Sequence, residues 1–250
     1  MTRRRLLALT GLLLAAGLAA LAVLPARWLM AILPPHWPLA IVDASGTVWA
    51  GRAALAIGPE QSRRRLPDPL HWRWSFARGP KMELHHPWLN GPLILALSPT
   101  GLIVSSQTLA LPAQALATLD ARIAAIDPGG RLSVTWPATR ISWKAQQNGT
   151  RILDAEWRDA ASALTPIRPL GHYTLSLTHA TGGGADLALA SRHGPLLLEG
   201  SGSLDTRQGL RFKGTARADP TVDPTIHAAL RDVLSALGPR HNDLTLLHYR

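Results

Sequence analysis

The longest apolar run of the chain lies within its first 24 residues. From Leu6 to Leu24 there are 19 residues without a charge. A helix rises about 1.5 Å per residue, so this run would extend about 28 Å, close to the thickness of a bilayer's hydrocarbon core. Arg3, Arg4 and Arg5 precede it, and such residues hold the preceding end in the cytoplasm. The pattern predicts one membrane-spanning helix, with the remainder of the chain delivered across the membrane.

A cleaved signal peptide is the competing interpretation of this segment. Its basic start is suitable, and Ala20-Leu21-Ala22 has the small residues of a cleavage site. However, the apolar run is longer than the roughly 7–15 residues of a signal peptide's apolar region, and apolar character resumes at Trp28. We therefore favour a retained anchor (residues 1–24), with Arg27 and Trp28 at the level of the lipid headgroups.

After a proline-rich linker, residues 25–40, the period of the pattern falls to two, which indicates β-strands. The alternation is clearest where Trp72, Trp74 and Phe76 share one face. Val48 alternates with its neighbours between two glycines, which predicts a strand with a bulge or a close backbone approach. Residues 60–69 indicate a basic loop. Further strands are expected at 41–44, 53–57, 82–86, 92–98, 102–106, 132–136, 141–144, 152–158, 173–179, 185–191, 196–204, 210–218 and 244–249. The prediction is a mainly β, antiparallel domain over 41–250 with two short helices.

Helical spacing occurs in two places. Residues 112–126 have an apolar face, and Asp127-Pro128-Gly129-Gly130 follows it. The second helix would begin at Asp223, a plausible N-cap, with Pro224 in its first turn. Gly238 would end it as the left-handed glycine that commonly follows a helix.

Two similar segments suggest a duplication. Gly91-Pro92-Leu93-Ile94-Leu95 resembles Gly194-Pro195-Leu196-Leu197-Leu198, and each is followed by another strand and a helix. A duplicated unit would divide the domain into halves 41–128 and 129–250. The alternative is a chance match of the kind that any β-rich chain offers.

Composition narrows the classes of function. Apolar residues make up 46% of the chain, which excludes a disordered protein. There is no cysteine, so disulfides and thiolate chemistry are excluded. The formal net charge is +10, but the positive residues are scattered apart from Arg63, Arg64 and Arg65. Without a basic stripe interleaved with aromatic residues we expect no nucleic-acid partner. Anionic lipid headgroups or an acidic protein would suit this charge. The alternative is an ordinary solvated surface that is rich in arginine.

Catalytic and metal-binding patterns are missing from the sequence. There is no G-x-S-x-G elbow, no phosphate-binding G-x-x-x-x-G-K-[ST] loop and no H-E-x-x-H helix. The one adjacent histidine pair, His85-His86, lies in a strand pattern, where neighbours point to opposite faces. We therefore expect no enzyme activity, no cofactor and no metal site.

Nine tryptophans are the remaining notable feature. Those in strand patterns are Trp72, Trp74, Trp136, Trp143 and Trp157. Packing within a sheet core is the simpler explanation, since a large ring buries much apolar area. The alternative is an apolar groove for a lipid tail, which would make the protein a lipid-binding or lipid-transfer protein.

Several of these motifs, in this order and behind an anchor, resemble the type II secretion system protein N family. Ser45-Gly46-Thr47-Val48-Trp49-Ala50-Gly51, followed by Trp72-Arg73-Trp74, is similar to its early motif. Its later half resembles Pro169-Leu170-Gly171-His172-Tyr173 and Gly194-Pro195-Leu196-Leu197-Leu198-Glu199-Gly200-Ser201-Gly202, then the helix ending at Leu237-Gly238. The family-motif positions in this chain are Gly46, Thr47, Trp49, Gly51, Trp72, Trp74, Gly171, Tyr173, Gly194, Pro195, Leu196, Gly200, Gly202 and Gly238.

The resemblance implies a non-catalytic inner-membrane component of the machine that exports folded proteins across the outer membrane. The anchor would cross the inner membrane once, and the β domain would lie in the periplasm. The machine's inner-membrane linker protein and its outer-membrane secretin would be its partners. The family supplies no catalytic residues to carry over.

Overall fold

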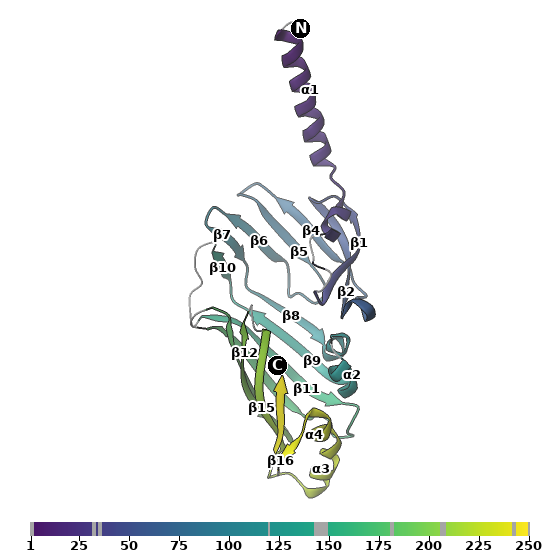
Figure 1. The fold of residues 1–250 in the computed structure, drawn as a ribbon, viewed down its shortest axis with the longest axis vertical. Coiled ribbons are helices and arrows are strands. Elements are labelled where there is room, and N and C mark those ends of the chain that lie inside the picture. The colour runs from purple at the N-terminus through teal and green to yellow at the C-terminus, as the bar shows by residue number, and fades with distance from the viewer. Residues whose placement is uncertain are drawn as a thin grey trace. The chain divides into compact units, whose positions relative to one another are not determined.

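A computed structural model describes residues 3–31, 34, 37–119, 121–142, 150–180, 183–205, 209–241 and 244–249. Contacts divide the chain into two compact units, Met1–His86 and Pro87–Arg250. The named strands pair antiparallel in both units, and the helices after Ala31 are short (Figure 1). The predicted mainly β, antiparallel fold is therefore confirmed. The halves 41–128 and 129–250 stay a prediction.

The first unit contains one long helix and a small sheet. The sheet has the order β1-β2-β4-β5, and β3 also pairs with β2. Arg64–Arg65 is thus a short strand within the segment that was expected to be a loop. The element bounds are α1 Arg3–Ala22, a 3-10 helix η1 Ala26–Ala31, β1 Leu39–Gly46, β2 Ala50–Ile57, a 3-10 helix η2 Glu60–Ser62, β3 Arg64–Arg65, β4 Leu70–Ser75 and β5 Lys81–His85.

α1 covers most of the predicted apolar run. The side chains of Arg3, Arg4, Arg5 and Leu6 lie outside the described residues. Among the residues that the structure describes, no helix combines the length and the apolar character needed to cross a membrane.

The core of the first unit lies between η1 and the sheet. Ala26, Ala53 and Trp72 are its buried members, at 1%, 2% and 5% exposure. Leu29, Trp74, Met82 and Leu84 pack around them. Trp72 and Trp74 therefore share the apolar face, as their alternation predicts.

The second unit contains a nine-stranded sheet and a smaller group of strands. In the smaller group β7 pairs with both β6 and β10. The large sheet has the order β16-β17-β15-β14-β13-β12-β11-β9-β8. The bounds are β6 Leu93–Ser98, β7 Gly101–Val104, β8 Gln107–Pro112, β9 Pro128–Trp136, β10 Thr139–Ser142, β11 Arg151–Ser162, β12 Gly171–His179, β13 Ala185–His193, β14 Leu196–Asp205, β15 Gly209–Ala218, β16 Arg240–His241 and β17 Leu244–Tyr249.

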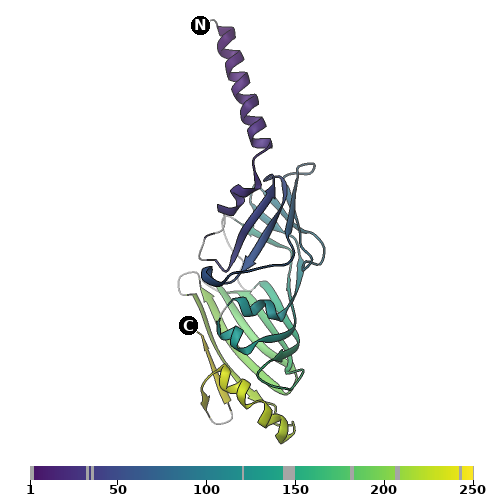
Figure 2. The same cartoon turned by 90° about the vertical axis from the view of Figure 1, so that its right-hand side faces the viewer.

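Both predicted helices are broken into shorter pieces. The first consists of a 3-10 helix, η3 Ala113–Thr118, and α2 Ala121–Ile126. The second consists of α3 Pro224–Ala229 and α4 Arg231–Leu237, separated at Leu230, whose ψ of −8° departs from helical geometry. The Asp223 N-cap is confirmed, because its carboxylate accepts a hydrogen bond from the Thr225 amide at 2.9 Å. α2 and α4 touch each other and lie on the same face of the large sheet (Figure 2).

The predicted role of Gly238 is wrong in one respect. Its φ of 161° is extended and not left-handed. A Cβ atom at this position would collide with the carbonyl oxygen of Leu246 in β17. Glycine is therefore required here by the close approach of a strand and not by a helix cap.

The core of the second unit lies between α4 and one end of the large sheet. Leu230, Val233 and Leu234 face the sheet and are at most 4% exposed. Trp157, Leu189 and Leu247 pack at its margin. Its buried members are Ala160, Leu170, Tyr173, Leu196, Leu198, Ala216, Leu230, Val233 and Leu234.

Candidate functional site

The early motif forms the tight turn between β1 and β2. Gly46 has a φ of 94°, which only glycine adopts readily, and the Thr47 amide donates to the Ala50 carbonyl at 2.9 Å. A Cβ on Gly51 would lie 2.6 Å from the ring of Trp72. The predicted close backbone approach is confirmed. Val48, however, lies in the turn and not in a strand, because the hairpin reverses between Thr47 and Ala50.

This turn is hydrogen-bonded to the end of α1. The indole Nε1 of Trp49 donates to the Leu21 carbonyl at 2.8 Å, and the Val48 amide donates to the Leu24 carbonyl at 3.0 Å. A bridge also joins Pro25 to Thr47. The Trp49 bond adds a donor to a carbonyl in the last turn of α1, and the Val48 bond pairs a carbonyl just beyond the helix. The motif therefore fixes how the chain leaves α1 and enters the sheet.

Three aromatic rings gather beside the turn, and we call Trp49, Trp74 and Phe76 the aromatic cluster. Trp49 meets Trp74 edge-on at 6.4 Å between centroids, and Trp74 stacks on Phe76 at 6.1 Å. Trp72 lies on the same face of β4, two residues before Trp74, and its Nε1 donates a hydrogen bond to the Val48 carbonyl at 3.1 Å. The two parts of the early motif, far apart in sequence, thus form one contact network.

The later motif centres on Tyr173 in β12. Its hydroxyl donates toward two carbonyl oxygens, Leu196 at 2.9 Å and Leu170 at 3.2 Å. Burial raises the pKa of this hydroxyl well above its ordinary value. Gly171 and Gly194 lie so close together that a Cβ on Gly194 would collide with the Gly171 Cα. The motif joins the starts of β12 and β14 by packing.

Pro195 and the glycines of β14 complete the later motif. The carbonyl of Pro195 accepts a hydrogen bond from the Asp219 amide at 2.9 Å. Gly200 and Gly202 provide the space in which the ring of Phe212 lies against the sheet, since a Cβ on Gly202 would be 3.2 Å from that ring. Sequence reasoning missed Phe212. Its alignment opposite Gly202 on β15 depends on strand register, which alternation does not reveal.

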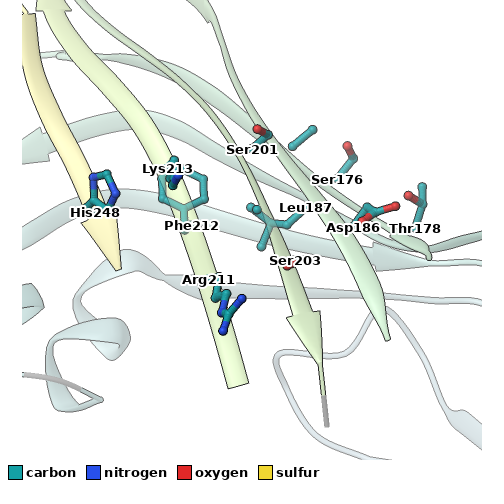
Figure 3. Close-up of a pocket in the computed structure, with 12 residues that line it drawn as sticks. Ser176, Thr178, Asp186, Leu187, Ser201, Ser203, Arg211, Phe212, Lys213 and His248 are labelled. Carbon is teal, nitrogen blue, oxygen red and sulfur yellow. The ribbon is translucent and has the colours of Figure 1, made fainter. Parts of the chain in front are cut away.

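The large sheet also carries a hollow of about 830 Å³ (Figure 3). Two rows of paired positions cross it, Thr178, Asp186, Ser203 and Arg211 in one and Ser176, Ala188, Ser201, Lys213 and His248 in the other. The hollow is open, and its lining mixes hydroxyl, charged and apolar side chains. Within the described part of the chain, no group of three or more metal-ligating side chains could hold an ion.

The tryptophans do not line that hollow. Trp72 is buried in the first core, and Trp157 packs against Tyr173 with ring centroids 5.7 Å apart. Trp143 lies outside the described residues. The sheet-packing interpretation thus accounts for Trp72 and Trp157. The hollow on the large sheet has no tryptophan lining, whereas a hollow of about 580 Å³ on the first sheet includes Trp72 among mostly polar and charged residues.

The predicted membrane-proximal residues follow α1. Leu24 is half-buried, and its carbonyl accepts a hydrogen bond from the Val48 amide. Arg27 is exposed, and Trp28 is 66% exposed. Neither motif brings a nucleophile, a base and an orienting group together. In the described residues both motifs determine packing and chain direction.

Comparison with known families gives this domain its identity. The model of the type II secretion system protein N family matches residues 38–244, and the chain belongs to that family. The match covers both units and every motif listed above except the residues of α1 and its exit. No curated protein and no solved structure matches the chain.

Proposed function

We propose that the protein is a non-catalytic inner-membrane component of the type II secretion system, which supports export of folded proteins across the outer membrane. The observation that carries the proposal is the family match over residues 38–244. The motif residues support a structural role, because they pack, cap and orient strands and make no reactive arrangement. The protein would act through contacts with other components and without turnover.

The apolar N-terminal run supports this role as a proposed membrane anchor. Residues 6–24 carry no charge, and Arg3, Arg4 and Arg5 precede them. The leucines of α1 whose side chains are described are 50–73% exposed, so they are available to lipid. We propose that this segment is retained in the inner membrane with its N-terminus in the cytoplasm, and that the β domain is periplasmic.

Strand edges are the proposed means of contact with partners. Among the described strands, β1 pairs only with β2, and β10 pairs only with β7. Each therefore has a second edge on which a partner's strand could add through main-chain hydrogen bonds. Val42 in β1 and Ile141 in β10 are 43% and 47% exposed. The machine's inner-membrane linker protein and the outer-membrane secretin are the proposed partners.

A clean deletion tests the function. It should leave the secreted substrates in the periplasm, and the full chain supplied in trans should restore export. Photo-reactive residues at Val42 and Ile141 should cross-link to secretion components, whereas one at the buried Ala53 should not. Normal export after deletion would refute the proposal.

A further inference from the structure

The aromatic cluster lies at the end of the proposed membrane helix. Trp49 is hydrogen-bonded to Leu21, one residue before α1 ends at Ala22. Trp74 and Phe76 extend from it, with Phe76 5.8 Å from Trp49 between centroids. If α1 spans the bilayer, its last turn lies where hydrocarbon gives way to headgroups. The cluster is then held at that depth by hydrogen bonds and not by the linker alone.

Exposure increases along this aromatic row. Trp72 is 5% exposed within the core, Trp74 is half-buried, and Phe76 is 59% exposed. The row thus begins in the core and ends as an apolar surface beside the helix. Indole rings favour the membrane–water interface, where one part of the ring is in contact with apolar groups and the other with water.

The charges beside the cluster are positive. Arg27 follows α1, and Arg78 lies in the turn between β4 and β5; both are exposed. Residues 76–80 of this turn contain no acidic residue. Lys81 is not available in the same way, since its ammonium lies 3.0 Å from the Glu83 carboxylate on the other face of the sheet. Two exposed arginines, one directly after α1 and one two residues after Phe76, match an anionic lipid headgroup layer.

We propose that the aromatic cluster, together with Arg27 and Arg78, docks on the anionic phospholipid interface next to α1. This inference rests on the proposed anchor. The docked β4–β5 turn gives the first unit a second point of attachment to the membrane, so that its sheet is held in one orientation. The partner is the lipid surface, recognised by ring burial among headgroups and by arginine–phosphate pairing.

The absence of cysteine makes a direct test available, because one introduced cysteine labels one site. The full chain with Ala77→Cys, which leaves all three rings of the cluster in place, carries an environment-sensitive fluorophore in vesicles of phosphatidylethanolamine and phosphatidylglycerol. His85→Cys is the matched control, exposed at the other end of β5 and on the opposite face. Lipids spin-labelled near the headgroup should quench the probe at 77 at least about threefold more strongly than at 85, because such labels act only on groups at interface depth.

Flotation of the same vesicles separates the two proposals. If the protein fails to float with them, the anchor is refuted. If it floats and the probes at 77 and 85 are quenched equally, the docking proposal is refuted and the anchor stands. Adding Arg78→Glu should weaken interface occupancy by at least about fivefold, because losing one basic residue near an anionic surface accounts for that much and the new negative charge adds repulsion. Unchanged quenching in that variant would refute the arginine's part in docking.

Discussion

Two glycines with positive φ angles differ in how closely other backbone atoms approach them. Gly194 has a φ of 128°, and a Cβ there would lie 2.7 Å from the Leu170 carbonyl oxygen. Gly209 also has a positive φ, 74°, but nothing lies within 4 Å of its Cβ position. Both glycines have a backbone conformation that is unfavourable for other residues. Only at Gly194 do other atoms crowd the Cβ position. Their comparison isolates the effect of the close approach between β12 and β14.

We predict that Gly194→Ala costs about 3 kcal/mol of unfolding free energy, because backbone strain adds to a clash with the backbone at residues 170–171. Gly209→Ala should cost about 1 kcal/mol from backbone conformation alone. Urea unfolding of the full chain in detergent, followed by tryptophan fluorescence, measures both. Equal losses would show that crowding at Gly194 contributes nothing.

Tyr173 gives a prediction with a pH dependence. Tyr173→Phe should lower the unfolding free energy by about 1–2 kcal/mol, because the buried hydrogen bonds of the hydroxyl to the Leu196 and Leu170 carbonyls are lost. Burial raises the pKa of this hydroxyl in the folded state, while in the unfolded chain it stays near 10. Above pH 10 the unfolded state therefore loses a proton that the folded state keeps. The stabilising contribution is complete below pH 10 and is lost as the pH rises toward the folded-state value.

The corresponding measurement compares wild type with Tyr173→Phe from pH 9 to 11. Wild-type stability should fall by about 1.4 kcal/mol per pH unit more than that of the variant above pH 10. Parallel curves would mean that Tyr173 is as accessible to ionisation in the folded state as in the unfolded chain.

Among the elements, the β1–β2 turn determines how α1 joins the first sheet. We predict that Trp49→Phe keeps the ring packing but loses the hydrogen bond to Leu21, which costs about 1 kcal/mol locally. The Val48 amide, which donates to Leu24, should then exchange its hydrogen about fivefold faster. Hydrogen–deuterium exchange of peptides covering 45–51 measures this.

Trp157→Phe is the control for that experiment. It removes an equivalent indole bond, to the Gly129 carbonyl at 2.9 Å in the second unit. Exchange over 45–51 should be unaltered in this variant. If Trp49→Phe also leaves the exchange unaltered, the Trp49–Leu21 bond does not stabilise the turn.

Local pattern predicts these elements better than it predicts their contacts. The alternation of Trp72, Trp74 and Phe76 correctly identifies a strand and its apolar face, and Asp223-Pro224 correctly identifies a helix start. The pattern around Val48 misled because a glycine-flanked hairpin turn also alternates. The Trp49–Leu21 bond spans 28 residues, and the Phe212–Gly202 contact depends on register. Both follow from the assembled sheets, which a local period does not encode.

In the full chain, the proposed anchor and the β domain have different roles. An anchor confines the domain to a thin layer at the membrane and so raises its effective concentration toward partners held in the same layer. The family match begins at residue 38, after α1. The domain thus carries the family's defining residues, and the anchor would determine where they meet their partners.

This division predicts what happens when residues 1–24 are replaced by a cleaved signal sequence. At native expression, export of the machine's substrates should fall toward the deletion level, because the freed domain loses a local concentration advantage of about 10²-fold or more. About hundredfold overexpression of the freed domain should then restore export by mass action. The assay is the ratio of secreted to periplasmic substrate, with periplasmic levels of the domain measured alongside.

Full export at native expression would contradict an anchoring role, whereas failure of overexpression to restore export would show that the anchor contributes orientation as well as concentration. If the anchor contributes orientation, the Arg78→Glu variant of the anchored protein should also lose export. The reason is that this variant weakens the second contact with the membrane, the docked aromatic cluster.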